Sequence, residues 1–271
     1  MKLLAYSQGD PAGCNIASHL ERIVPLSHVD AGVAPLPHHG DLLLMRLEGR
    51  PVDMEGPIPD VEWLLFLTQH RSSSGMRCLT AQTPGNLTGR SDLGGRPREV
   101  AISNPPLQSR LIVELQRIAG EMGLDCPVTL EATHHGPTSL PFPVTFVEIG
   151  SDPDAWGDDS LGEAVARAVH RAVSSPLPSD LPGGRCGMGV GGGHYPEKFT
   201  RLITEEGWLL GHIIPKYAMQ GGMDASLLET CMERTAVGCS SIAIDWKGTP
   251  SVFRESLKTL AQTKGIELVK V

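Results

Sequence analysis

Short apolar runs alternate with helical patterns along most of the chain, and this alternation constrains the fold more than any other feature. Runs of strand length cover residues 1–6, 42–47, 61–68, 77–83, 128–133, 144–149, 208–214 and 241–246. Between them, apolar residues repeat at helical spacing from Leu107 to Met122 and from Leu161 to Ala172. Strands that alternate with helices predict an α/β sheet.

Local signals place the helix starts and the divisions of the chain. Asn104 before Pro105-Pro106, and Ser151 before an acidic turn, are typical of helix N-termini. The runs over 128–133 and 144–149 are predicted to be neighbouring strands. No period of 20 to 50 residues repeats, so we expect one domain over residues 1–271. The Pro/Ser/Gly-rich segment 174–184 is the best internal boundary.

Composition limits the compartment. The six cysteines form no C-x-x-C pair, which favours reduced, mostly buried thiols. The apolar run over residues 1–6 is too short for a signal peptide, and no stretch reaches the roughly 18 apolar residues of a membrane span. We therefore expect a cytoplasmic protein without a membrane segment.

The net charge of −8 excludes a broad electrostatic grip on nucleic acid. It leaves room for a local grip on one end of an RNA, because basic residues that are scattered in the sequence can cluster in space.

Two adjacent histidines, His134 and His135, stand where a strand gives way to a loop. Adjacent strand residues point to opposite faces, so a regular strand would give a site only one of them. At the strand end both can turn the same way, and sites collect at strand ends in α/β sheets. The competing interpretation is one packed and one exposed histidine.

Three glycines precede His194, and Pro196 follows it at the expected start of a helix. Glycines let backbone N–H groups approach a ligand closely, and a helix N-terminus favours anions. Lys198 lies four residues after His194, on the same face if the helix begins early. The run from Gly187 to Gly192 also satisfies G-x-G-x-x-G, but so glycine-rich a stretch meets that pattern easily.

Isolated polar residues add weaker candidates. Arg71 follows a strand and has the geometry to hold a phosphate, although a polar turn explains it equally well. Glu148 is an acid in an apolar strand, either facing solvent or buried with a function. No H-E-x-x-H, C-x-x-C or H-x-H is present, so a zinc site would have to combine distant segments.

Together these features resemble one family, the D-aminoacyl-tRNA deacylases of the archaeal and plant type. The specific motifs are T-H-H-G-P-T at 133–138 and G-G-G-H-Y-P-E-K-F-T at 191–200. Further similar stretches, in family order, are residues 10–16, 70–75, 80–86, 147–150, 211–217 and 244–248. One departure is Gln82, at a position that the resemblance associates with histidine, so a metal ligand would be lost there.

The resemblance implies a three-layer α/β/α fold with a mixed sheet, like that of nucleoside phosphorylases and peptidyl-tRNA hydrolases. It implies one or two zinc ions per chain and hydrolysis of the ester that joins a D-amino acid to tRNA. We expect His134, His135 and His194 as metal ligands or general base, with Glu148 as ligand or orienting group. Residues expected to bind the tRNA substrate are Arg71, Lys198, Lys216, Gly192, Gly193 and Thr138.

The expected partner is tRNA charged with a D-amino acid, bound by a monomer. Two other classes remain open at this point. A non-catalytic protein that binds an RNA end or a nucleotide would keep the glycine turn and the basic residues. A nucleoside phosphorylase-like enzyme is suggested by the implied fold alone. Release of amino acid from charged tRNA separates the three.

Overall fold

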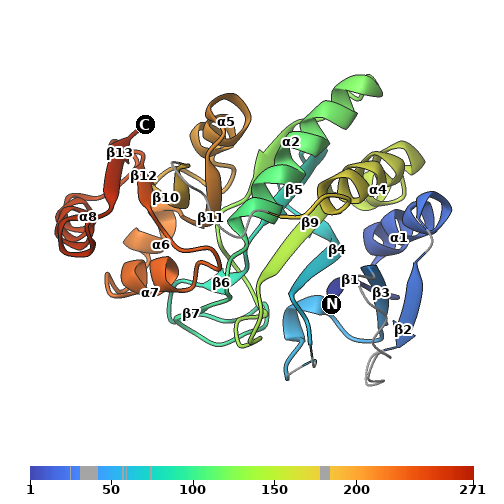
Figure 1. Ribbon diagram of the computed structural model, residues 1–271, viewed down its shortest axis with the longest axis horizontal. Helices are drawn as coiled ribbons and strands as arrows, with labels where there is room; N and C mark the ends of the chain where they lie inside the picture. Colours follow the sequence, from blue (N-terminus) through green and yellow to red (C-terminus); the bar gives the residue numbers. More distant parts are fainter. Residues whose placement is uncertain (25, 31–41, 57, 59, 74, 178–183) are drawn as a thin grey trace.

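A computed structural model describes residues 1–24, 26–30, 42–56, 58, 60–73, 75–177 and 184–271 (Figure 1). Its larger sheet has seven strands in the order β2-β3-β1-β4-β9-β5-β8. β5 runs antiparallel to β9 and parallel to β8, so the sheet is mixed. The strands of this sheet are β1 (Lys2–Ser7), β2 (Ser27–Asp30), β3 (Leu42–Leu47), β4 (Trp63–Arg71), β5 (Cys78–Gln82), β8 (Val128–Leu130) and β9 (Val144–Ser151).

Helices α1 (Pro11–Ile23), α2 (Pro105–Glu121) and α4 (Asp159–Val173) cover one face of this sheet (Figure 1). Each begins at a side-chain cap, since Asp10, Asn104 and Asp158 accept hydrogen bonds from the first-turn N–H groups. The helical pattern that opens at Ser151 forms two helices, the short α3 (Pro153–Trp156) and α4, because Asp158 caps a new helix.

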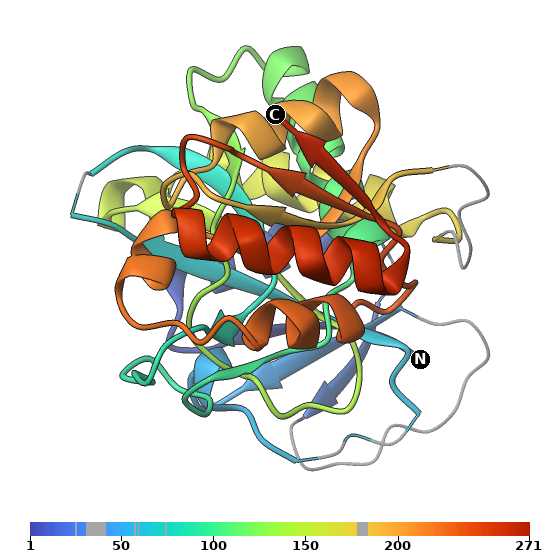
Figure 2. The ribbon, with the colours of Figure 1, turned by 90° about the vertical axis from the view of Figure 1, so that its left-hand side faces the viewer.

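A second sheet is fully parallel and has the order β11-β10-β12-β13. Its strands are β10 (Cys186–Val190), β11 (Leu209–Ile214), β12 (Ser241–Ile244) and β13 (Glu267–Lys270). Its helices are α5 (Glu197–Glu206), α6 (Lys216–Gln220), α7 (Leu227–Glu233) and α8 (Ser251–Lys264). α2 and α5 pack on one face of this sheet, and α7 and α8 pack on the other, with α8 outermost (Figure 2).

The α/β class with a mixed sheet is confirmed, and the predicted helix-sheet-helix layering surrounds the smaller sheet. The face of the larger sheet opposite its helices is covered instead by connecting segments, which include η1 (Pro51–Asp53) and the loop with Leu140 and Phe142. The short pair β6 (Gly85–Asn86) and β7 (Glu99–Val100) packs through Val100 in the apolar cluster of the smaller sheet. The prediction that 128–133 and 144–149 pair directly is wrong, because β5 lies between them.

No described helix has the length and apolar character that crossing a bilayer requires.

The two sheets share one apolar core. Residues of β4 and β9 in the larger sheet, and of α2, form one continuous apolar cluster with residues of α5 and β11, which belong to the smaller sheet. The predicted boundary 174–184 falls between the two sheets in sequence, although residues 178–183 lie outside the described part. Single-domain organisation stays a prediction.

Alternation along the central strands decides where polar side chains can gather. Leu65, Leu67 and Val147 face the helices and belong to the shared core. Phe66 and Phe146 face the other way, and because strand side chains alternate, Thr68, His70 and Glu148 follow them on that loop-covered face. The site described next is therefore built on the face of the larger sheet that has no helices over it.

Candidate active site

A buried carboxylate, Glu131, is the centre of a ring of histidines. It comes directly after β8 and is 1% exposed. Its Oε2 lies 2.9 Å from His194 Nε2, 3.1 Å from His70 Nδ1 and 3.8 Å from His134 Nε2. A fully buried acid is stable only when it is paired, and the histidines provide that pairing.

A second buried carboxylate, Glu148 of β9, adjoins the first. The Thr68 hydroxyl donates a hydrogen bond of 3.1 Å to its Oε1. Its Oε2 lies 3.3 Å from His70 Nδ1, and its Oε1 lies 3.8 Å from His135 Nε2. His70 therefore stands between two carboxylates, which ties the two halves of the cluster together.

Two tyrosines orient the histidines from the smaller sheet. The hydroxyl of Tyr195 is 2.7 Å from His70 Nε2, and that of Tyr217 is 3.3 Å from His194 Nδ1. Tyr195 and His194 lie in the turn after β10, and Tyr217 lies in α6. The carbonyl of His194 accepts a hydrogen bond of 2.8 Å from Ala132 N, next to Glu131. The site is thus assembled from both sheets.

Burial and pairing act against each other in the cluster. Burial opposes ionisation of Glu131, but hydrogen bonds from His194 and His70 hold its pKa well below the usual value. Burial likewise lowers the pKa of His70, but its bonds to the two carboxylates prevail and raise the pKa to about 12. His134 differs, because burial and the neighbouring His135 lower its pKa to about 4.

His134 and His135 both reach the site, with ring centroids 4.4 Å apart. His135 has a φ of 50°, so the chain leaves extended geometry there and the two rings need not point to opposite faces. Nδ1 of His134 donates to the Ala132 carbonyl at 2.8 Å, and Nδ1 of His135 donates to the Gly136 carbonyl at 2.6 Å. In each ring the other nitrogen, Nε2, faces the cluster.

Gln82, the departure noted in the sequence, is buried beside His135. Its amide Nε2 lies 2.9 Å from His135 Nε2 and 3.4 Å from Glu148 Oε1. A neutral N–H donor thus joins the imidazole to the carboxylate. A cation held by these two groups would have to displace that amide.

Three of these side chains have the geometry of a metal site. One ligand atom each of His70, Glu131 and His194 lies within 4.8 Å of the others. In the described structure, the Glu131 carboxylate has no hydrogen-bond partner outside this ring of histidines. Two imidazoles and one carboxylate are a ligand set that suits catalytic zinc. The residues therefore fit the ion that the sequence implied.

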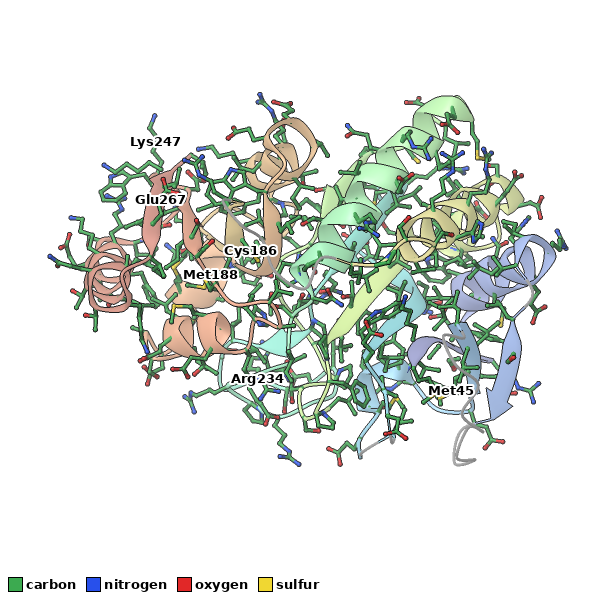
Figure 3. The ribbon with its side chains drawn as sticks, viewed as in Figure 1. Met45, Cys186, Met188, Arg234, Lys247 and Glu267 are labelled. Atoms are coloured by element: carbon green, nitrogen blue, oxygen red, sulfur yellow. The ribbon has the colours of Figure 1, made fainter. Side chains whose placement is uncertain are left out.

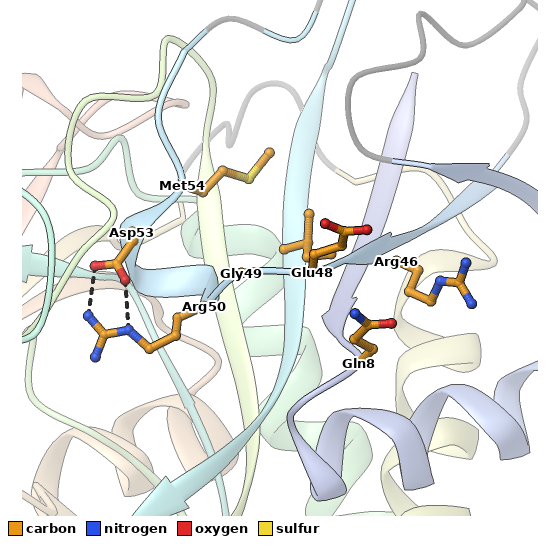
Figure 4. Close-up of a pocket in the computed structure, with 8 residues that line it drawn as sticks. Gln8, Arg46, Glu48, Gly49, Arg50, Asp53 and Met54 are labelled. Atoms are coloured by element: carbon orange, nitrogen blue, oxygen red, sulfur yellow. Dashed lines mark hydrogen bonds and ion pairs between the residues drawn. The ribbon is translucent and has the colours of Figure 1, made fainter.

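One cavity is lined by residues of this cluster, and a second cavity adjoins the first. The first, of about 520 Å³, is lined by residues that include Asp10, His70, His134, Phe146 and Glu148. The second, of about 550 Å³, shares Glu48, Gly49 and Arg50 with it (Figure 4). Arg50 is held there by Asp53, with Nε and Nη2 at 2.7 and 2.9 Å from its carboxylate oxygens. The cluster thus opens toward a space large enough for a nucleoside with an attached residue.

A family model described as D-aminoacyl-tRNA deacylase matches residues 58–269. The chain belongs to the D-aminoacyl-tRNA deacylase family. A relative of that name from Aeropyrum pernix is 34% identical over 98% of both chains, and one from Cenarchaeum symbiosum is 35% identical over 99% of both. A crystal structure of a conserved protein of unknown function aligns with a TM-score of 0.87 at 26% identity, covering 100% of this chain and 95% of that one.

Within this deacylase-family chain, the four predicted chemical residues gather in one place: His134, His135, His194 and Glu148. The predicted substrate residues are dispersed. Arg71 lines the first cavity, with its guanidinium 4.7 Å above the Trp156 ring. Lys198 is engaged by Asp245 Oδ1 at 2.8 Å and by the Val271 carbonyl at 3.0 Å, so it is tied to the end of the smaller sheet.

The remaining predicted substrate residues differ in accessibility. Lys216 begins α6, and its backbone N–H donates to the Gly192 carbonyl at 2.9 Å. Gly192 adopts a φ of 77°, which favours glycine, and leads into Gly193. Thr138 is 1% exposed, and its hydroxyl binds Glu99 and the Arg96 N–H. Contact between Thr138 and the substrate stays a prediction; in this structure its hydroxyl is buried and hydrogen-bonded inside a loop.

Sequence reasoning did not select His70, Glu131, Tyr195 and Tyr217. Glu131 had a usable signal, since it is an acid inside a β-branched run directly before the histidine pair, as Glu148 is in the next run. His70 stands two residues beyond Thr68, in the same alternation as Phe66. Nothing local marks the tyrosines, whose role comes from the contact between the two sheets.

Proposed function

We propose that this chain hydrolyses the ester bond between a D-amino acid and the terminal ribose of tRNA. The products are free tRNA and a D-amino acid, so a mischarged tRNA is withdrawn from translation. The observation that carries the proposal is the pair of buried carboxylates, surrounded by histidines, that opens into a cavity in a chain of the deacylase family. A protein that only binds RNA needs no such buried ionised cluster.

We further propose that His70 Nδ1, Glu131 and His194 Nε2 hold a zinc ion. When bound, zinc supplies Lewis acidity that polarises an ester carbonyl and brings the pKa of a water toward about 7. The tyrosine hydroxyls at the other nitrogens of His70 and His194 fix the direction of both rings, which is the usual arrangement around ligand histidines. We expect one ion per chain, because the Gln82 amide already joins His135 to Glu148.

His134 is the residue that we assign to proton transfer. Its Nδ1–H is committed to the Ala132 carbonyl, so Nε2 is the nitrogen that accepts a proton, and it points toward the cluster. The side chain is one quarter exposed and lines the cavity, as a general base must do to reach water. Both ring nitrogens of His135 are engaged, so its role is to orient Glu148 through Gln82.

Fewer residues are available for the proposal of how the phosphates at the tRNA end are bound. Arg71 at the cavity and Lys216 at the start of α6 are the proposed cations for the terminal phosphates. The backbone at Gly192 and Gly193 is the proposed source of N–H donors to the carbonyl oxygen of the ester, a contribution of about 10² to 10³ in rate. We propose that the enzyme acts as a monomer.

The deciding experiment measures release of amino acid from one tRNA charged in parallel with the D- and the L-form of the same residue. We expect rapid release from the D-form and slow release from the L-form. Release from neither, with intact tRNA binding, would favour the non-catalytic RNA-end binding protein. A phosphate-dependent cleavage of nucleosides without ester hydrolysis would favour the phosphorylase.

A further inference from the structure

Three cations surround one indole ring at the edge of the smaller sheet. Lys270 Nζ lies 4.0 Å from the centroid of the Trp246 ring, Arg254 Cζ lies 5.0 Å from it, and Lys258 Nζ lies 5.4 Å from it. Lys247 follows the ring in sequence and projects away from the body of the protein (Figure 3). We call these five residues the Trp246 patch.

The patch has an excess of positive charge in an acidic protein. Within the described part of the chain, the only ion pair of the patch joins Lys258 to Glu255 at 2.8 Å. No described carboxylate lies within ion-pair distance of Lys247, Arg254 or Lys270. Like charges that lie this close repel one another, and the contacts of exposed cations with the indole ring offset this repulsion only in part. An anion at this surface would relieve the repulsion.

Strand register puts the patch on the same edge of the sheet as the catalytic turn. Val190, the last residue of β10, pairs with Ile244, which in turn pairs with Lys270. The strands are parallel, so the turn that carries His194, the segment with Trp246 and the end of β13 all leave the same edge. With neighbouring strands about 4.8 Å apart, Lys270 lies roughly 10 Å from the end of β10.

We propose that the Trp246 patch docks the phosphodiester backbone of the tRNA, a few nucleotides from the ester that the histidine cluster cleaves. This rests on the proposed function. The turn that carries His194 and the residues of the patch leave the same edge of the smaller sheet, so a single RNA strand that enters the cluster can continue along this edge to the patch. The patch is an open edge rather than an enclosed cavity, which suits a continuous polyanion better than a free phosphate. It also reconciles RNA binding with a net charge of −8.

The test compares the double variant K247Q/K270Q with a matched double variant, R22Q/R117Q, which removes equal charge from α1 and α2. Three quantities are measured: Kd for uncharged tRNA, kcat and KM for D-aminoacyl-tRNA, and turnover of a D-aminoacyl adenosine ester. We expect K247Q/K270Q to raise Kd and KM for tRNA roughly tenfold, which corresponds to a total loss of about 1.4 kcal/mol. Its kcat, and its turnover of the adenosine ester, should match those of the wild type and of R22Q/R117Q.

Two results would overturn the proposal. Equal effects of both double variants would show that the chain's general charge, not the patch, governs binding. An equal loss with the adenosine ester would show that the substitutions act on the catalytic cluster instead. Failure of the wild type to hydrolyse either ester would reject the proposed function, whereas the Kd comparison with uncharged tRNA would still decide about the patch.

Discussion

The two sheets contribute to the site in different ways. The larger sheet supplies Glu148 and His70 from inside buried strands, where their ionisation depends on mutual pairing. The smaller sheet supplies His194 and Tyr195 from a glycine-rich turn, whose backbone is hydrogen-bonded to Ala132 and to Lys216. The strands of the larger sheet therefore fix the buried charges, and the turn completes the geometry of the site. Changes in the larger sheet should affect stability and activity together, and changes in the turn should affect mainly activity.

Removal of metal should have the largest effect, because the proposed ion joins the two regions. Prolonged dialysis against EDTA should lower deacylation about 10³-fold, and added zinc should restore it, since several kcal/mol of transition-state stabilisation would be lost. Tm should fall as well, because a ligand at 100 times its Kd stabilises the folded state by about 2.7 kcal/mol. Magnesium serves as the control for a nonspecific divalent effect. Full activity in thoroughly depleted protein would reject the zinc mechanism.

Two histidine variants sharpen the contrast. His194→Ala should lower kcat by about 10² or more with a smaller fall in Tm than His70→Ala, because His70 still pairs with Glu131 when the His194 ring is removed. His70→Ala should lower both kcat and Tm, because Glu131 and Glu148 would keep their buried charges without the imidazole between them. Breaking such a buried pair costs about 3 to 5 kcal/mol of stability. Near-normal turnover in His194→Ala would remove this residue from the catalytic set.

The strands of the fold could be predicted because they bury apolar runs, and β3 agrees with its predicted range. β10 could not, because Gly187 and Gly189 have no β propensity. A Cβ on Gly187 would come within 1.9 Å of the Ser241 carbonyl oxygen, so close strand packing, invisible in the sequence, selects glycine. The order β9-β5-β8 was missed for a related reason. The order of the strands along the chain does not reveal which strand lies between two others in the sheet.

For the site, unusual residue patterns were informative and single residues were not. The glycine run before His194 and the pair His134-His135 stood out because structure alone rarely requires them. Predicting Glu131 and His70 as site residues would have required knowing which face of the sheet the helices cover. The same alternation along the strands places Leu65 on the helix-covered face, in the core. The burial of Thr138 could not be predicted, because a sequence motif does not indicate which of its side chains are buried.

A histidine outside the site tests the electrostatic half of the comparison. His212 of β11 is fully buried, and burial lowers its pKa to about 4 despite backbone hydrogen bonds from the ring to Arg234 and Ala101. Since an unfolded histidine titrates near 6.5, its neutral form should contribute full stability above that pH. As the pH falls from about 6.5 to 4, this contribution should disappear, so the free energy of unfolding should decrease by on the order of 2 to 3 kcal/mol. Chemical unfolding at several pH values measures this.

The His212→Leu variant isolates this contribution. Asp10 acts in the opposite sense, because burial raises its pKa to about 6 and its folded form is favoured by protonation. The difference in unfolding free energy between wild type and variant removes the Asp10 contribution. A difference that stays constant between pH 7 and 4 would show that His212 is not held neutral.

The smallest expected effect concerns salt, and it distinguishes a local RNA contact at the smaller sheet from a broad basic face. Each phosphate contact releases counterions and contributes about 0.7 to 0.9 to the slope of log K against log salt. A chain of net charge −8, gripping RNA through the Trp246 patch and the cations near the cavity, should give a slope of magnitude roughly 2 to 4. In K247Q/K270Q the slope should fall by about 1.5, whereas R22Q/R117Q should retain the wild-type value, because its arginines lie far from the carboxyl edge of the smaller sheet. A wild-type slope near 8 would mean that an extensive basic face, and not this patch, binds the tRNA.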